Sequence, residues 1–366
     1  MDTHTTTPQP IWKTLLWMGH WALRYLLAGV MLVYGWSKVV LGQFGTLDYS
    51  NALTQYGEMS PMGLFWRFFG YSEFVQITSG LVEVLAAALL LFHGTAWLGG
   101  LLMTAACGAV FAFNMAYDIP VKQNSLAYTV MGLLIVLPYV PVLLRMLRGR
   151  GAPPLPTPRP IPWPKVRRVT RWVGGALAVL MIVGSALPFV SGAFYGARPT
   201  PVDSELPGVY RVVADSREPA AQLAEDTRWQ MVSFGELVRA PGATAAATAD
   251  GGTPDVDAYG EDARTVGMEL RLANGDYRSG IATIDGDVLH VELKRPRAGD
   301  FGTLEQREDA FDLDWTADGP DRIALTGETT DGTPVDVTLE IDPELQYLHH
   351  NEMHWWPDFS NGAINR

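Results

Sequence analysis

The chain has 366 residues, of which 48% are hydrophobic and only 18% are charged. Residues 1–195 hold 13 basic and 6 acidic residues, a net charge of +7, whereas residues 196–366 hold 14 and 33, a net charge of −19. This division excludes one uniform soluble globule, and the acidic half argues against nucleic acid as a partner. A single cysteine, Cys107, excludes an intrachain disulfide, a CxxC redox pair and a thiolate-held iron–sulfur cluster.

Five long apolar stretches predict five membrane-spanning helices. A helix that crosses the hydrocarbon core needs roughly 20 apolar residues, and the stretches that meet this length are residues 21–41, 74–92, 97–117, 125–144 and 172–194. The alternative is a large soluble protein with buried helices, but so many long runs would leave it little polar exterior. Residues 61–70 are aromatic and too short to cross, which predicts a segment lying in the membrane interface.

The domain organisation follows from these spans and from the basic residues between them. We expect an N-terminal tail (residues 1–19), a four-helix transmembrane bundle (20–147), a proline-rich linker (148–171), a fifth transmembrane helix (172–195) and an acidic β domain (196–366). Eight Lys or Arg and no Asp or Glu lie between Arg145 and Arg171, which predicts a cytoplasmic linker. Counting crossings from this linker puts the N-terminus in the cytoplasm and the acidic domain outside.

The acidic domain has the pattern of an antiparallel barrel or sandwich. Apolar residues alternate with polar ones from Val266 to Leu272 and then meet Asn274-Gly275, a type I′ hairpin signal. Asp285-Gly286 and Asp331-Gly332 are further turn signals between alternating segments. Residues 240–260 are rich in Ala, Gly, Thr and Asp, and we expect a mobile loop there.

Polar residues inside the predicted spans fall on helical stripes rather than at random. Spacings of three and four residues put each set on one helix face, together with small residues that allow helices to approach closely. The stripes are Arg24, Ala28, Met31, Gly35 and Lys38 in the first span; Glu73, Gln76, Gly80, Glu83 and Ala87 in the second; and Gly100, Thr104, Cys107, Phe111, Asn114 and Asp118 in the third. We expect the three stripes to face one another inside the bundle.

Depth along the helices suggests specific partners. Counting about 1.5 Å per residue from the outer ends predicts two interhelical ion pairs, Lys38 with Glu73 and Arg24 with Glu83. Asp118 and Lys122 would then close the outer mouth of the bundle. Two alternatives stay open: the polar residues form a ligand or proton site, or Arg24 and Lys38 extend to opposite membrane interfaces.

Histidines offer weaker signals. His349, His350, Glu352 and His354 include an i, i+4 pair, but a metal site would need a defined helix and a third ligand. His20 and His93 lie near the cytoplasmic ends of their spans, where anchoring at the interface is favoured over an axial haem pair. We therefore predict no metal ion and no evident cofactor, with quinone as the one cofactor left open.

The first 147 residues resemble the DoxX family of bacterial membrane proteins. The resemblance rests on LAGVMLVYGWSKVVLG (residues 27–42), GLVEVLAAALLL around Glu83, and YDIPVK (residues 117–122). The rest is similar to a DoxX-like subgroup with a fifth span and an outer domain that opens LPGVY at Leu206, although the ending MHWWPDFSNGAINR departs from that subgroup. The resemblance implies a four-helix bundle in the bacterial cytoplasmic membrane. It also implies a role connected with quinone-coupled sulfur oxidation or with membrane complexes that handle oxidative stress.

Three functional hypotheses follow. The first is a non-catalytic scaffold that anchors the outer domain in the lipid bilayer and assembles with an oxidoreductase partner. The second is a redox subunit in which a quinone head group meets a polar set formed by Lys38, Glu73, Asn114 and Tyr117. The third is a carrier of a small amphipathic molecule. The lack of a cofactor motif favours the first hypothesis, whereas the polar stripes favour the second or third.

Overall fold

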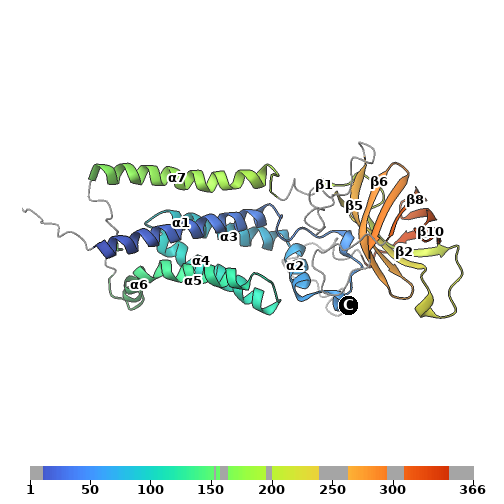
Figure 1. Cartoon of the computed structure of the whole chain (residues 1–366), viewed down its shortest axis with the longest axis horizontal. Helices are drawn as coiled ribbons and strands as arrows, with labels where there is room; N and C mark the ends of the chain where they lie inside the picture. Colours follow the sequence, from blue (N-terminus) through green and yellow to red (C-terminus); the bar gives the residue numbers. More distant parts are fainter. Residues whose placement is uncertain are drawn as a thin grey trace, which may run out of the picture. The chain divides into compact units, whose positions relative to one another are not determined.

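The computed structural model of the chain describes residues 11–151, 154–156, 164–194, 200–238, 263–294 and 309–345. The chain folds into two compact units, one helical and one mainly β (Figure 1). The helical unit comprises Met1–Thr46 and Ser60–Arg198, and the β unit comprises Leu47–Met59 and Pro199–Arg366. The predicted fold class, a helical membrane part followed by an antiparallel β-barrel, is confirmed. The chain enters the β unit twice, first through a short segment that directly follows the first span.

Five helical stretches are long and apolar enough to cross a membrane, as predicted: Ile11–Val39, Glu73–Leu91, Ala96–Ala116, Lys122–Leu147 and Trp172–Val190. The helices of the unit are α1 (Ile11–Val39), α2 (Pro61–Tyr71), α3 (Glu73–Leu91), α4 (Ala96–Ala116), α5 (Lys122–Val136), the 3₁₀ turn η3 (Leu137–Tyr139), α6 (Val140–Leu147) and α7 (Pro164–Val190).

Two helix boundaries differ from the sequence prediction. Helix α1 begins at Ile11, inside the predicted N-terminal tail, and α7 begins at Pro164, inside the predicted linker. Both predictions placed the boundary where the apolar run starts, but helix continues into the more polar turns beside it because no interior proline interrupts them. Proline in the first turn, as at Pro164, is compatible with a helix start because its missing N–H has no intrahelical partner there.

The segment predicted to lie in the interface is an α-helix, α2. The Ser60 hydroxyl caps it by accepting a hydrogen bond from the Gly63 N–H at 3.0 Å, and Pro61 occupies its first turn. Ser72 separates α2 from α3, whose first turn it caps in the same way by accepting from Val75 N–H. The two serine caps therefore make α2 and α3 separate helices, so that the chain from Pro61 to Leu91 is not one continuous helix.

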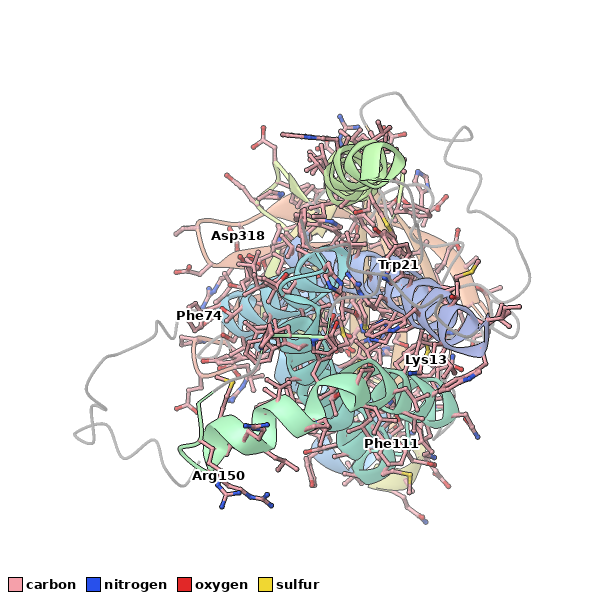
Figure 2. The ribbon with its side chains drawn as sticks, turned by 90° about the vertical axis from the view of Figure 1, so that its left-hand side faces the viewer. Lys13, Trp21, Phe74, Phe111, Arg150 and Asp318 are labelled. Carbon is pink, nitrogen blue, oxygen red and sulfur yellow. The ribbon has the colours of Figure 1, made fainter. Side chains whose placement is uncertain are left out.

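Glycines set the closest helix contacts. A Cβ built on Gly80 of α3 would lie 2.6 Å from the Gly35 carbonyl oxygen of α1, so only glycine allows the two backbones to meet there. Helices α4 and α5 meet similarly at Gly132, where a Cβ would lie 2.5 Å from the Thr104 hydroxyl. Helix α7 packs along α1 and α3 at the edge of the helical unit. Figure 2 shows α7 nearly along its axis.

The β unit is a closed eight-stranded barrel in which every neighbouring pair is antiparallel. Its strands are β2 (Gly208–Asp215), β3 (Trp229–Phe234), β5 (Arg264–Leu272), β6 (Tyr277–Asp285), β7 (Val288–Lys294), β8 (Asp309–Ala317), β9 (Arg322–Glu328) and β10 (Pro334–Ile341), while β1 (Thr200–Pro201) and β4 (Leu237–Val238) form a separate pair. Consecutive barrel strands are neighbours, and β10 closes on β2 (Figure 1). Apolar side chains fill the interior, including Tyr210, Phe234 and Met268, as expected for a barrel of this size.

The predicted hairpins exist, but none of the three dipeptides forms a type I′ turn. At Asn274-Gly275 only the glycine has a positive φ, 87°, and its N–H donates to the Leu272 carbonyl at 2.9 Å. A type I′ turn would need positive φ at both residues. Gly275 instead takes the left-handed bulge position after the turn, and Gly332, with φ 81°, does the same at Asp331-Gly332. Strand β5 therefore ends at Leu272, one residue earlier than a two-residue turn at Asn274-Gly275 would place it.

Leu47–Met59 packs on the outer surface of the barrel, and we call this segment the strap. It contains the 3₁₀ turns η1 (Tyr49–Asn51) and η2 (Tyr56–Glu58). Tyr49 and Leu53 of the strap are buried against Val209 and are flanked by Met231 and Tyr277, which share one apolar cluster on this surface. The strap is therefore an integral part of the β unit although it lies between two helices in sequence.

Candidate functional site

Lys38 and Glu83 form an ion pair inside the helical unit. The distance from Lys38 Nζ to Glu83 Oε2 is 2.6 Å, and each residue is only 5% exposed. The Lys38 ammonium also lies 5.9 Å from the centre of the Tyr34 ring. A buried charge that has its counter-charge and an aromatic face beside it is stabilised in place, so the pair joins α1 to α3.

Both predicted ion pairs are wrong, and the helix register explains why. The close contact at Gly80 puts Lys38 level with that residue, since a Cβ on Gly80 would lie 2.8 Å from Lys38 Cβ. Glu83 is then ~4.5 Å away along α3, whereas Glu73 is ~10 Å away in the other direction. Glu73 is instead the exposed first residue of α3.

Arg24 binds a backbone carbonyl instead of Glu83. Its Nε and Nη2 both donate to the Leu90 oxygen, at 2.8 and 2.5 Å, and the residue is only 2% exposed. The antiparallel register that joins Lys38 to Glu83 places Arg24 near the end of α3, about a turn past Ala86. Neither side chain reaches a surface of the helical unit, because Arg24 is 2% and Lys38 is 5% exposed.

The remaining predicted site residues separate into different contacts. Asn114 donates to the Ser125 hydroxyl at 3.0 Å, which links α4 to α5. Asp118 and Lys122 form an exposed ion pair beside the α4–α5 turn. The hydrogen bond from Lys122 lowers the pKa of Asp118. Tyr117 stacks against Phe65 with 5.0 Å between ring centres.

Tyr117 belongs to an aromatic cluster that the sequence reasoning missed. The cluster joins α2, the end of α4 and the residues after α1, with ring centres 4.8 to 6.3 Å apart. Its members are Phe44, Phe65, Trp66, Phe69, Phe113 and Tyr117. The aromatic composition of residues 61–70 could have pointed to packing against other helices as well as to an interface.

A second polar group lies around Arg24, and the sequence reasoning found it only in part. His20 Nε2 lies 3.0 Å from the Ile135 carbonyl oxygen, and the His20 and Tyr139 rings are 6.0 Å apart. Tyr139 is fully buried in η3, between Pro138 and Pro141. Those prolines in the middle of a predicted span were the signal that could have drawn attention to it.

The strap is held to the barrel by two charged residues of β5. Along β5, Met268, Leu270 and Leu272 point into the barrel, while Glu269 and Arg271 point outwards and are covered, with 2% and 6% exposed. Glu269 accepts from the Leu53 N–H at 2.8 Å and from the Thr54 hydroxyl at 2.9 Å.

Arg271 completes this attachment. Its guanidinium donates to the Leu53 carbonyl at 2.7 Å and to both carboxylate oxygens of Glu58 at 2.7 and 3.1 Å. The hydrogen bond from Arg271 is the main cause of a lowered pKa of Glu58. On the other side of the strap, Asp48 accepts from the Glu236 N–H at 2.7 Å. The strap is therefore bound by charge-assisted hydrogen bonds at both ends.

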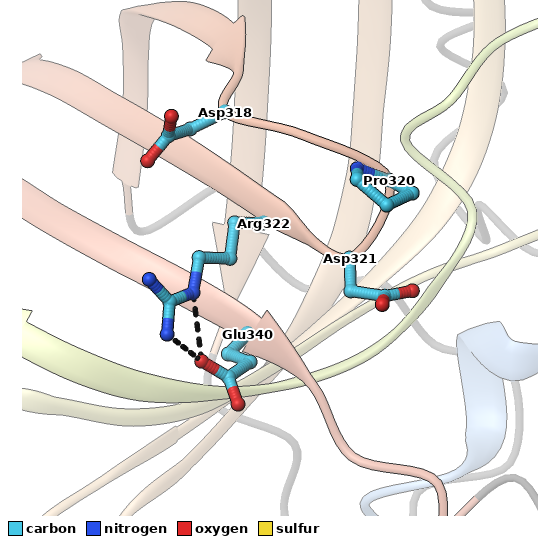
Figure 3. Close-up of a pocket in the computed structure, with 5 residues that line it drawn as sticks. All are labelled: Asp318, Pro320, Asp321, Arg322 and Glu340. Atoms are coloured by element: carbon cyan, nitrogen blue, oxygen red, sulfur yellow. Dashed lines mark hydrogen bonds and ion pairs between the residues drawn. The ribbon is translucent and has the colours of Figure 1, made fainter.

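A shallow depression of about 260 Å³ at the start of β9 is lined by Asp318, Pro320, Asp321, Arg322 and Glu340 (Figure 3). Arg322 donates to Glu340 at 2.8 and 2.6 Å, and both side chains are about half exposed. Because its charges pair with each other in solvent, this surface is a weak candidate for a site. Within the described residues, no group of three His, Cys, Asp or Glu could hold a metal ion; His349, His350, Glu352 and His354 lie outside them.

Comparison with known proteins finds one informative relative. The chain is 34% identical over 113 residues to the uncharacterised protein YwoB of Bacillus subtilis (strain 168), a match that covers 31% of this chain and 71% of YwoB. No protein-family model matches the chain. No solved structure matches it either.

Proposed function

This chain belongs to the same family as YwoB of Bacillus subtilis, and we propose that it is a non-catalytic scaffold of the bacterial cytoplasmic membrane. In this role the helical unit anchors the acidic barrel in the lipid bilayer and assembles with an oxidoreductase or stress-response enzyme as its partner. The resemblance of the first 147 residues to the DoxX family supports this class of partner.

The Lys38–Glu83 pair is the observation that carries the proposal. Lys38 belongs to the predicted quinone-contacting set, and its ammonium is already bound to a carboxylate 2.6 Å away. Asn114, from the same set, is bound to Ser125. Polar groups that bind each other across two helices hold those helices together. In a catalytic site, by contrast, the hydrogen-bond donors point towards the substrate.

The strap supports a role in presenting the barrel. A domain joined only through α7 would be connected by a single stretch of chain. Here a second stretch, between α1 and α2, is built into the β unit through Glu269 and Arg271. The barrel is therefore connected to the helical unit through two stretches of the chain instead of one.

The predicted orientation is part of the proposal. The strap follows the first span and the barrel follows the fifth, so four crossings separate them and they emerge on the same side. The basic linker supports a cytoplasmic N-terminus and an extracytoplasmic barrel. Alkaline phosphatase fused after the barrel should be active and a fluorescent protein fused before residue 11 should fluoresce; the opposite pair of results would reverse the orientation.

The functional test is purification from native membranes, with identification of the proteins and cofactors that remain bound. A scaffold should retain partner proteins and carry no quinone, haem or flavin in its own purified form. The double variant Lys38→Met/Glu83→Leu should retain the same partners, because the pair holds helices and touches no ligand. Bound quinone together with activity towards quinol analogues, both lost in the double variant, would contradict the scaffold and favour the redox subunit.

A further inference from the structure

Arg24 is a buried cation without a counter-charge. Among the described residues no carboxylate lies within 4.0 Å of its guanidinium, in contrast to Lys38, which has Glu83. Two of its five N–H groups share the single carbonyl oxygen of Leu90. A charged side chain inside a membrane bundle is costly unless it meets an opposite charge, so an anion is the partner that this position needs.

Three polar atoms around Arg24 also have no hydrogen-bond partner in the described part of the chain. They are His20 Nδ1, His93 Nδ1 and the Tyr139 hydroxyl oxygen, each buried and without a hydrogen bond. His20 is 8% exposed and Tyr139 is not exposed at all. A buried polar atom without a partner is destabilising, and three of them beside one unpaired cation indicate a shared missing group. We call His20, Arg24, His93 and Tyr139 the Arg24 cluster.

The position of the cluster limits where such a group comes from. His93 lies in the connection between α3 and α4, which are two crossing helices, so the connection lies near one surface of the bilayer. Burial is the main cause of a lowered pKa of His93, and the nearby charges of Arg24 and His20 lower it further. The cluster is therefore at the depth of lipid headgroups, where phosphate groups are concentrated.

The tautomer of His20 further defines the chemistry. Its Nε2 faces the Ile135 carbonyl oxygen, which can only accept, so Nε2 carries the proton. In the neutral ring Nδ1 is then an acceptor and needs a donor. Arg24 and Tyr139 offer N–H and O–H donors and need an acceptor. An anionic oxygen and a hydroxyl on the same molecule satisfy Arg24, Tyr139 and His20.

We propose that the Arg24 cluster binds an oxyanion that also carries a hydroxyl group. The oxyanion lies against the Arg24 guanidinium and accepts from the Tyr139 hydroxyl, and the hydroxyl of the bound molecule donates to His20 Nδ1. Inorganic hydrogen phosphate and the headgroup of phosphatidylglycerol share this chemistry. This binding site lies on a different part of the helical unit from the Lys38–Glu83 pair and does not depend on the proposed scaffold role.

The test measures thermal unfolding of the full-length purified protein in two arms. In one arm inorganic phosphate replaces chloride at matched ionic strength; in the other, phosphatidylglycerol replaces phosphatidylcholine in mixed micelles. The midpoint temperature of thermal unfolding should rise by several degrees with phosphate, with phosphatidylglycerol, or with both. Tyr139→Phe should weaken the apparent affinity about tenfold, because it removes one hydrogen bond to a charged group, and Arg24→Gln should abolish the response.

Tyr139→Phe keeps the result interpretable if Arg24→Gln does not fold. Because the Tyr139 hydroxyl has no partner among the residues that the structure describes, this variant should be as stable as the wild type when neither phosphate nor phosphatidylglycerol is present. Tyr128→Phe, in the same span but outside the cluster, should respond like the wild type. A response to phosphate identifies a free oxyanion, and a response to phosphatidylglycerol alone identifies a lipid headgroup. No response in either arm, or an equal response in Tyr139→Phe, would overturn the proposal.

Discussion

Replacing Arg271 by methionine should loosen the strap from the barrel. The substitution keeps an apolar stem of similar length and removes the guanidinium that binds the Leu53 carbonyl at 2.7 Å and the two Glu58 oxygens. Loss of the charge-assisted bond to Leu53 costs about 1.5–3 kcal/mol. The Glu58 side chain is 36% exposed and can return to water, so its bonds add only about 0–1 kcal/mol.

A loss of about 2–3 kcal/mol in the free energy of strap opening is large enough to measure by amide hydrogen exchange. Each 1.4 kcal/mol is a factor of ten, so exchange of amides in the strap should accelerate by roughly 30- to 140-fold. The Leu53 amide reports most directly because it donates to Glu269. Peptides from the interior strands of the barrel should change much less.

Arg322→Met is the matched control. Arg322 also donates two hydrogen bonds to one glutamate, but on an exposed surface of the same barrel, so its loss should leave exchange in the strap unchanged. Strap amides that already exchange freely in the wild type, or that exchange equally in the wild type and Arg271→Met, would refute the assignment of Arg271 as the residue that holds the strap.

Two further predictions concern helix packing and pH. Gly80→Ala should lower the stability of the helical unit in detergent by about 1–3 kcal/mol, because the added methyl would lie 2.6 Å from the Gly35 carbonyl oxygen. Gly184→Ala is the control. Because no atom lies within 4 Å of a Cβ at Gly184, this variant should be as stable as the wild type or more stable. Because Arg271 lowers the pKa of Glu58, the stabilisation from this carboxylate is complete above its ordinary value of 4.5 and is lost as the pH falls through the lowered value. The difference in thermal midpoint between wild type and Arg271→Met should therefore narrow well below pH 4.5, and a difference that grows on acidification would contradict this sign.

The sequence predicted the architecture well because architecture depends on composition and alternation. Long apolar runs with few or no charged residues identify the spans, and the alternation from Val266 to Leu272 identifies a strand with one face in the core. Burial of Lys38, Glu83 and Arg24 also agrees with a helix face turned inwards. These properties are carried by neighbouring residues and can be read without knowing what packs against them.

The contacts between distant segments could not be predicted in the same way. The partner of Lys38 depends on the register of α1 against α3, which the approach of Gly35 to Gly80 sets and a count of depths does not. The strap has no helical or strand period, and Leu53 meets Glu269 across 216 residues of sequence. Glu269 and Arg271 looked like ordinary outward-facing residues of an alternating strand, and only the strap makes them buried.

The most direct test of a structural role for the Lys38–Glu83 pair is a double-mutant cycle measured as the free energy of unfolding in detergent. Lys38→Met and Glu83→Leu should each cost about 3 kcal/mol, because each leaves one buried charge without its partner. The double variant should recover most of that loss, giving a large coupling energy between the two positions. Costs that simply add, or single variants as stable as the wild type, would contradict a bundle held together by this pair.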